Sequence, residues 1–121
     1  MKVDVSDLIG IPYKEHGRDN AGYDCYGLAL EVVRRYGKTL PDVVYSAEHD
    51  ISLSDENTPL LPLRKIEEVE EGCLIEMRYR GELHIGVYIG NKRFIHATRG
   101  QGVRLSRLGI IPVHAYWRVK G

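Results

Sequence analysis

The chain has no long apolar run, no excess charge of either sign and few cysteines. Its 121 residues contain no uninterrupted apolar stretch approaching the roughly 18 residues of a membrane-spanning helix. The opening MKVDVSDLIG has no cationic region followed by an apolar one, so we expect synthesis in the cytoplasm without a signal peptide. Because 17 basic residues balance 17 acidic ones, no global field attracts a polyanion. We therefore expect neither a membrane nor a nucleic acid as a partner.

The scarcity of cysteine excludes a disulfide framework or a zinc ribbon. Only Cys25 and Cys73 occur, in unlike contexts and without a CxxC pair. Two free thiols are the simplest reading for a chain that is not exported, and a Cys25–Cys73 bridge is the minor alternative. A length of 121 residues fits one compact domain. We expect a single domain over residues 1–121, acting as a monomer.

Hydrophobic periodicity predicts an α+β domain. Apolar residues recur at three- and four-residue steps from Cys25 to Tyr36, the pattern of an amphipathic helix, and Gly37 follows as a stop. One short helical turn is expected near residues 6–9, within a loop that reaches residue 24, and Ser46–Pro59 is the longest predicted loop. Strands are predicted at Arg64–Val69, Cys73–Tyr79, Leu83–Ile89, Arg93–Thr98, Val103–Ser106 and Pro112–Val119. We expect the helix to pack on a mostly antiparallel sheet of five to six strands, made by successive hairpins.

Cys25 stands where the predicted helix begins. A helix N-terminus favours negative charge and so lowers the pKa of a thiol placed there, which makes Cys25 a candidate nucleophile. Asp24 fits the N-cap position, and Gly27 leaves room beside the sulfur. The structural alternative is that Cys25 simply begins the apolar face of the helix. A nearby base would decide between the two.

Two histidines on neighbouring predicted strands are the candidate base and its partner. Alternation places His84 on the polar face of its strand, and the next strand carries His96. An odd-numbered hairpin loop, or an equivalent bulge, puts both on one face, whereas a plain two-residue loop separates them. If they share a face, His84 can take the proton of Cys25 while His96 fixes its tautomer.

Two other interpretations of these histidines stay open. Both can be satisfied polar residues on a half-buried sheet, or they can join Cys25 in a Cys-His-His zinc site, although the spacing of metal-ligand pairs is missing. The remaining histidines, at positions 16, 49 and 114, lie in loop-like or isolated settings, and we expect them at the surface.

Four segments, in order, resemble the NlpC family of cell-wall cysteine peptidases, whose fold is a pared-down relative of papain. Cys25 follows Tyr13 by 12 residues and His96 follows His84 by 12, spacings that agree with this family, and the final Tyr-Trp pair is similar to its closing strand. The matching segments are Ile9–Gly17, Gly22–Leu28, Leu83–Asn91 and Arg93–Ala97. The resemblance implies a minimal papain-like, NlpC-type fold with an N-terminal catalytic helix.

The same resemblance implies the roles of the site residues. Cys25 would be the nucleophile, His84 the general base and His96 the orienting residue. The hydroxyl of Tyr13 would supplement the Cys25 backbone N–H at the oxyanion. Asp24 would help to bind the free amine of a substrate, although Tyr26 stands where the family usually has a serine that belongs to this amine site. No metal or organic cofactor is implied.

The function implied is a cysteine endopeptidase for peptidoglycan stem peptides, at the bond between D-glutamate, through its γ-carboxyl, and a diamino acid. Tyr26 and the residues after the helix look more like variants encoded by bacteriophages and prophages, with tail proteins as partners. The alternatives are a non-catalytic tail or wall-binding component, and a thiol amidase or acyltransferase. We expect the enzyme to reach the wall after lysis or virion delivery, or to act on recycled peptides in the cytoplasm.

Overall fold

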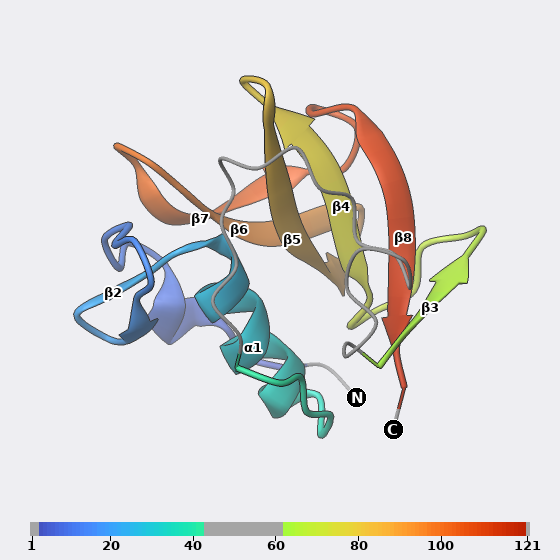
Figure 1. The fold of residues 1–121 in the computed structure, drawn as a ribbon, viewed down its shortest axis with the longest axis horizontal. Coiled ribbons are helices and arrows are strands. Elements are labelled where there is room, and N and C mark those ends of the chain that lie inside the picture. Colours follow the sequence, from blue (N-terminus) through green and yellow to red (C-terminus); the bar gives the residue numbers. More distant parts are fainter. Residues whose placement is uncertain (1–2, 43–61, 121) are drawn as a thin grey trace.

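The computed structural model describes residues 3–42 and 62–120, which form an α+β fold. One helix packs along one side of a six-stranded antiparallel sheet (Figure 1). The elements are η1 (Ser6–Leu8), β1 (Arg18–Asp19), β2 (Gly22–Tyr23), α1 (Cys25–Arg35), β3 (Leu63–Ile66), β4 (Leu74–Tyr79), β5 (Glu82–Gly90), β6 (Arg93–Thr98), β7 (Gly102–Arg107) and β8 (Val113–Val119). The predicted loop Ser46–Pro59 and the histidine at position 49 lie outside the described residues. Among the residues described, no helix combines the length and the apolar character needed to cross a bilayer.

Helix α1 forms where the periodicity predicts it. Asp24 caps it by accepting a hydrogen bond of 2.7 Å from the Gly27 N–H, which satisfies one of the N–H groups that a helix leaves unpaired. The buried apolar residues of the helix recur at helical spacing: Leu28, Ala29, Val32 and Val33. The helix ends at Arg35, and Gly37 follows with a φ of +82°, a conformation that glycine adopts without strain.

The sheet has the strand order β3-β8-β4-β5-β6-β7, with antiparallel neighbours throughout. Successive hairpins account for β4 to β7, as predicted, but not for β8, which returns to lie between β3 and β4. The alternating buried residues Ala115, Trp117 and Val119 give β8 a longer apolar face than short β3 has, so β8 takes the interior place. The Trp117 indole N–H also donates to the buried carboxylate of Glu76, 2.8 Å away on β4.

A small hairpin precedes the helix, inside the segment predicted to be a loop. Strands β1 and β2 pair two residues each, too few for a periodic pattern to be read from the sequence. The segment of Tyr13 is attached to β2, because the Lys14 N–H donates to the Tyr23 carbonyl at 3.1 Å and the Tyr23 N–H donates to the Pro12 carbonyl at 3.0 Å. Since β2 runs directly into Asp24 and Cys25, this attachment places Tyr13 beside the start of the helix.

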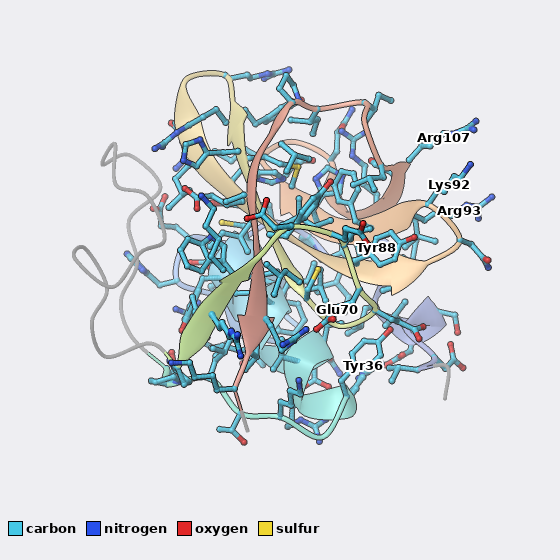
Figure 2. The ribbon with its side chains drawn as sticks, turned by 90° about the vertical axis from the view of Figure 1, so that its right-hand side faces the viewer. Tyr36, Glu70, Tyr88, Lys92, Arg93 and Arg107 are labelled. Carbon is cyan, nitrogen blue, oxygen red and sulfur yellow. The ribbon has the colours of Figure 1, made fainter. Side chains whose placement is uncertain are left out.

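The turn between β5 and β6 decides which face the two histidines occupy. Asn91 and Lys92 have φ of 54° and 60°, the signature of a two-residue hairpin turn, and a bulge between Tyr88 and Gly90 shifts the register. The Lys92 N–H donates to the Tyr88 hydroxyl at 3.0 Å, at the edge of the molecule that Figure 2 shows. The bulge is the one predicted to be needed with a two-residue loop, and His84 and His96 share one face.

Beyond this turn β5 separates from β6. Their pairing runs from Gly90↔Arg93 through Tyr88↔Phe94 to Val87↔Ile95, and within the described residues it goes no further. The start of α1 lies at this opening, because Cys25 lines one pocket with residues of β5 and β6, and the backbone N–H of Ile85 favours its thiolate. At this opening the thiol lines the same pocket as His84.

Candidate active site

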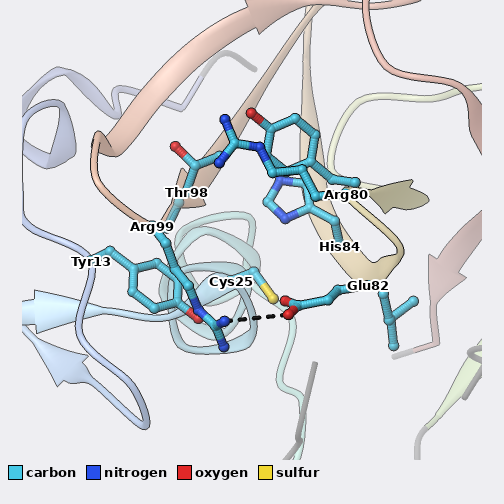
Figure 3. Close-up of a pocket in the computed structure, with 10 residues that line it drawn as sticks. Tyr13, Cys25, Arg80, Glu82, His84, Thr98 and Arg99 are labelled. Carbon is cyan, nitrogen blue, oxygen red and sulfur yellow. Dashed lines mark hydrogen bonds and ion pairs between the residues drawn. The ribbon is translucent and has the colours of Figure 1, made fainter. Parts of the chain in front are cut away.

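A cleft at the opening between β5 and β6 gathers three of the five predicted site residues (Figure 3). Its walls include Tyr13, Cys25, Glu82, His84, Thr98 and Arg99. The fourth, His96, contacts His84 from behind, and Asp24 lies one residue before the thiol as the helix cap. The cleft therefore brings together a thiol, an imidazole and a phenol from three separate parts of the chain.

The Cys25 thiol is largely shielded from water, with 7% of the residue exposed. Burial raises its pKa to about 11, although the N–H groups of Ile85, Tyr26 and Cys25 itself point to the sulfur and favour the thiolate. The N–H groups at the helix start thus lower this pKa as expected, but burial has the larger effect and the net pKa is raised. The cost of removing water from a charged sulfur raises the pKa by more than the helix N-terminus lowers it.

The imidazole rings of His84 and His96 are in direct contact. His84 Nε2 lies 2.7 Å from His96 Nδ1, with the rings at 73° to each other. The second nitrogen of His96, Nε2, lies 2.7 Å from the Oγ of Ser106 on β7. Because Nε2 of His84 is hydrogen-bonded to His96, only Nδ1 of His84 remains for a proton from the thiol. We call the hydrogen-bonded side chains of His84, His96 and Ser106 the relay.

If His84 acts as a base, the hydrogen bonds of the relay determine the tautomers of both His84 and His96. A neutral imidazole carries one N–H, so a lone pair on His84 Nδ1 requires the proton on Nε2, where it donates to His96 Nδ1. His96 must then carry its proton on Nε2 and donate it to the hydroxyl of Ser106. Ser106 is the residue that sequence analysis missed. The available signal was the alternation of β7, which places Ser106 and Arg104 on the face of His96.

Among the residues that the structure describes, the groups acting on the two relay histidines all disfavour an imidazolium. Burial, followed by the nearby charge of Arg104, lowers the pKa of His84 to about 4. Burial, His84 and Arg104 lower the pKa of His96 to about 3. The relay ends on a neutral hydroxyl, and the side chain directly across from His96 is Arg104 rather than a carboxylate. The free protein therefore holds a neutral thiol and a neutral imidazole, and the proton must move as the thiol attacks.

We expect Ser106→Ala to lower kcat/KM about tenfold, because the His96 N–H then loses its acceptor and the favoured tautomer of His84 is weakened. Ser106→Thr keeps the hydroxyl and should stay within about threefold of the wild type. The measurement is kinetic, paired with ¹⁵N spectra of the two imidazoles. Protonation of His96 at Nδ1 in the wild-type protein would show that the relay runs in the opposite direction.

The stability of the protein should fall on mild acidification. Both relay histidines are neutral when folded and have a pKa near 6.5 when unfolded, so the unfolded state binds more protons. The free energy of unfolding should therefore be highest above about pH 6.5 and decline as the pH falls toward 4 and then 3. Urea unfolding at several pH values measures this decline. His114→Gln, at an exposed site, should leave this dependence of the unfolding free energy on pH unchanged. If His114→Gln abolished the decline, the decline would belong to His114 and not to the relay histidines.

The carboxylate of Asp24 is fully engaged within the protein. Its Oδ1 accepts from the Gly27 N–H at 2.7 Å and from Arg18 at 2.8 Å, while its Oδ2 accepts from the His16 N–H at 3.0 Å. Arg18 also reaches Asp42 at 2.8 Å. The capping role predicted for Asp24 is confirmed. Its role in binding a substrate amine stays a prediction, and an amine would have to share an oxygen that already has a partner.

Two glycines let the segment before the helix pack tightly on it. A Cβ added to Gly27 would lie 2.1 Å from the carbonyl oxygen of Gly17, and one added to Gly17 would lie 2.2 Å from that of Gly22. The predicted reason for Gly27, space beside the sulfur, is thus replaced by close backbone packing. Tyr26, buried, donates its hydroxyl to the Pro41 carbonyl at 2.6 Å.

Tyr13 faces the cleft near the sulfur. Burial raises its pKa, and the charge of a Cys25 thiolate would raise it further, while Arg99 favours the phenolate through a hydrogen bond. The Arg99 guanidinium also lies 5.7 Å from the centre of the Tyr13 ring. Tyr13 is therefore a neutral hydroxyl donor beside the nucleophile, as an oxyanion partner must be.

The alternative interpretations of the cysteines and histidines are less favoured by the geometry. Cys25 and Cys73 are free thiols, and burial raises the pKa of Cys73 to about 11. A zinc ion would need the ring nitrogens of His84 and His96 to converge on a third point, whereas they face each other at 2.7 Å. Within residues 3–42 and 62–120, no cluster of three or more potential metal ligands occurs. The histidines at positions 16 and 114 are exposed, as predicted.

One cleft of the α+β fold holds a thiol, an imidazole and a hydroxyl donor. Residues 10–119 match the model of the NlpC/P60 family, and the chain belongs to this family. The expected family and α+β fold are thereby confirmed. The crystal structure of the NlpC/p60 domain of the peptidoglycan hydrolase SagA superposes with a TM-score of 0.64 at 19% identity, over 93% of this chain and 91% of that one.

Curated relatives share more sequence with the chain. It is 30% identical over 118 residues to the probable peptidoglycan endopeptidase LytE of Bacillus subtilis, covering 95% of this chain and 30% of LytE. It is 29% identical over 116 residues to the murein DD-endopeptidase MepS/murein LD-carboxypeptidase of Escherichia coli, covering 93% of this chain and 54% of that protein. The chain thus spans between about a third and about a half of these relatives.

Proposed function

We propose that the chain is a cysteine endopeptidase that hydrolyses peptidoglycan stem peptides at the bond between the γ-carboxyl of D-glutamate and a diamino acid. The observation that carries the proposal is the cleft that Cys25 and His84 both line, with His96 hydrogen-bonded to His84 behind it. The names of the curated relatives support the substrate class. The bond itself rests on the resemblance to the family.

The proposed reaction is acyl transfer through a thioester. The Cys25 sulfur attacks the amide carbon while its proton moves to Nδ1 of His84, and the Cys25 N–H and the Tyr13 hydroxyl hold the oxyanion. The C–N bond then breaks as His84 returns that proton to the leaving amine. Water attacks the thioester, again giving a proton to His84, and the sulfur leaves to recover it. His96 keeps its neutral tautomer throughout.

Mass spectrometry of products from defined muropeptides tests the proposal. The expected products are a fragment with a free γ-carboxyl on D-glutamate and a fragment that begins with the diamino acid. Because the relative MepS is named as a DD-endopeptidase and LD-carboxypeptidase, the panel should include a cross-linked peptide and a tetrapeptide. Cleavage at those bonds alone would overturn the proposed bond, and no cleavage anywhere would overturn the proposed activity.

We propose a phage or prophage tail as the setting of this activity, with delivery to the wall in a virion or on lysis. The support is Tyr26 in place of the usual serine, together with the sequence after the helix. Antibody detection of the chain in purified virions tests this setting. The alternative of a non-catalytic tail or wall-binding component is disfavoured by the assembled thiol and relay, and transfer to an added amine would identify an acyltransferase.

A further inference from the structure

A buried hydroxyl lies in the cleft without a role in the relay. Thr98 ends β6 on the same face as His96, and its side chain lines the cleft, although the residue is only 3% exposed. Its Oγ1 has no hydrogen-bond partner among the described residues. Buried hydroxyls in folded proteins nearly always have a partner, and a rotation of the Thr98 side chain would turn this oxygen toward a group in the cleft that the residue lines.

An arginine on the rim of the same cleft has no ionic partner among the residues described. Arg80 stands at the tip of the β4–β5 turn, exposed, and its guanidinium lies 5.3 Å from the centre of the Tyr79 ring. The Tyr79 ring lies 5.5 Å from that of His84. The aromatic ring therefore holds the positive charge of Arg80 close to the site of reaction.

The other arginine of the cleft is already neutralised. Arg99 lies 3.3 Å from a carboxylate oxygen of Glu82 and 3.5 Å from one of Glu15. The ion pair with Glu82 is drawn below the Cys25 sulfur in Figure 3, on the side of the cleft away from Arg80. The unmatched positive charge of the cleft therefore belongs to Arg80, on the side where Figure 3 also shows the Thr98 hydroxyl.

We propose that Arg80 and Thr98 form a subsite for a free carboxylate of the peptide, next to the bond that Cys25 attacks. A guanidinium supplies charge and N–H donors, and a hydroxyl supplies one more donor, which together match the two oxygens of a carboxylate. This subsite rests on the proposed peptidase function. It explains both unpartnered groups with one ligand group, and it makes the enzyme selective for acidic peptides over their amides.

The carboxylate can come from either side of the scissile bond. On the acyl side it is the free α-carboxylate of a γ-linked residue, and on the leaving side it is a carboxylate of the released amino acid. Three peptides separate these sources: one with both groups free, one amidated on the acyl side and one amidated on the leaving side. Amidation removes the charge and leaves the shape of the peptide almost unchanged.

The experiment compares kcat/KM of the wild type, Arg80→Gln, Thr98→Val and Thr98→Ser on the three peptides. In the wild type, amidation of one side should lower kcat/KM about tenfold, and that side identifies the source. Arg80→Gln should lose about tenfold on the free acid and no longer distinguish the amide. Thr98→Val should lose part of the preference, and Thr98→Ser should keep it.

Arg93→Gln is the matched control, because Arg93 is exposed at the other end of β6 and Figure 2 shows it directed away from the strands. It should retain the full preference for the acid. Equal rates of the wild type on all three peptides, or an unchanged preference in Arg80→Gln, would overturn the subsite.

Peptide binding to Cys25→Ala by calorimetry separates this proposal from the proposed function. Tighter binding of the acid than of the amide, abolished by adding Arg80→Gln, sustains the subsite even if the wild type cleaves none of the peptides. Equal binding of acid and amide overturns the subsite even if the peptides are cleaved. Failure of hydrolysis and failure of carboxylate recognition are thus read from different measurements.

Discussion

Cys25→Ala is expected to lower the rate of stem-peptide hydrolysis by at least about 10⁴-fold, because Cys25 is the one thiol among the described residues that line the cleft. The substitution removes one sulfur from the start of α1 and keeps the backbone N–H groups there. Thermal unfolding should therefore change little. The measurement is product formation from a defined muropeptide at enzyme concentrations high enough to detect the residual rate.

Cys73→Ala is the matched control for this prediction. Both thiols are buried, and burial raises the pKa of each to about 11, so neither stands out by ionisation alone. Cys73 does not line the cleft, and its replacement should leave activity within about threefold of the wild type. Equal activity of Cys25→Ala and wild type would show that Cys25 is not the nucleophile and would overturn the proposed function.

His84→Ala should lower kcat/KM for a peptide by about 10³-fold, in the range that general acid–base catalysis contributes. With the free protein holding a neutral thiol, His84 has two tasks, to accept the thiol proton and to protonate the leaving amine. The alcohol of an ester substrate can leave without that protonation, so His84→Ala should slow ester hydrolysis less than amide hydrolysis. The ratio of the two losses measures the acid role separately.

His114→Ala provides the comparison for His84, since His114 is exposed on β8 and outside the cleft. It should hydrolyse both substrates at the wild-type rate. Retention of peptide hydrolysis within threefold in His84→Ala would assign the proton transfers to another group. An ester loss as large as the amide loss would limit His84 to activation of the thiol.

Much of the fold could be predicted because its elements are regular. The apolar spacing after Asp24 predicts α1 to within a residue, and β6 was predicted with its observed bounds. The parity argument also named the condition under which His84 and His96 share a face, and the bulge at Tyr88–Gly90 meets it by restoring the register lost in a two-residue turn. These predictions depend on neighbouring residues and on one turn.

The remaining features depend on contacts between distant segments. The place of β8 beside β4 is set by which strand buries more apolar surface, a property of the assembled sheet. Ser106 joins the relay only because β7 lies beside β6, and Arg18 meets Asp24 only through the small hairpin. The helix start lowers the pKa of Cys25 as predicted, but the larger opposing effect of burial was not predicted, because burial of the sulfur cannot be read from the helix start alone.

The backbone N–H of Ile85, which favours the thiolate form of Cys25, gives the nucleophile a reporter on a neighbouring strand. A thiol, a thioester and an alkylated sulfur differ as acceptors, so each chemical state of Cys25 places a different electron density in front of one backbone proton. The amide resonance of Ile85 in a proton–nitrogen correlation spectrum should therefore move at each step of the catalytic cycle. A single backbone peak, next to His84 in the sequence, would follow acylation and deacylation in real time without a chromophore on the substrate.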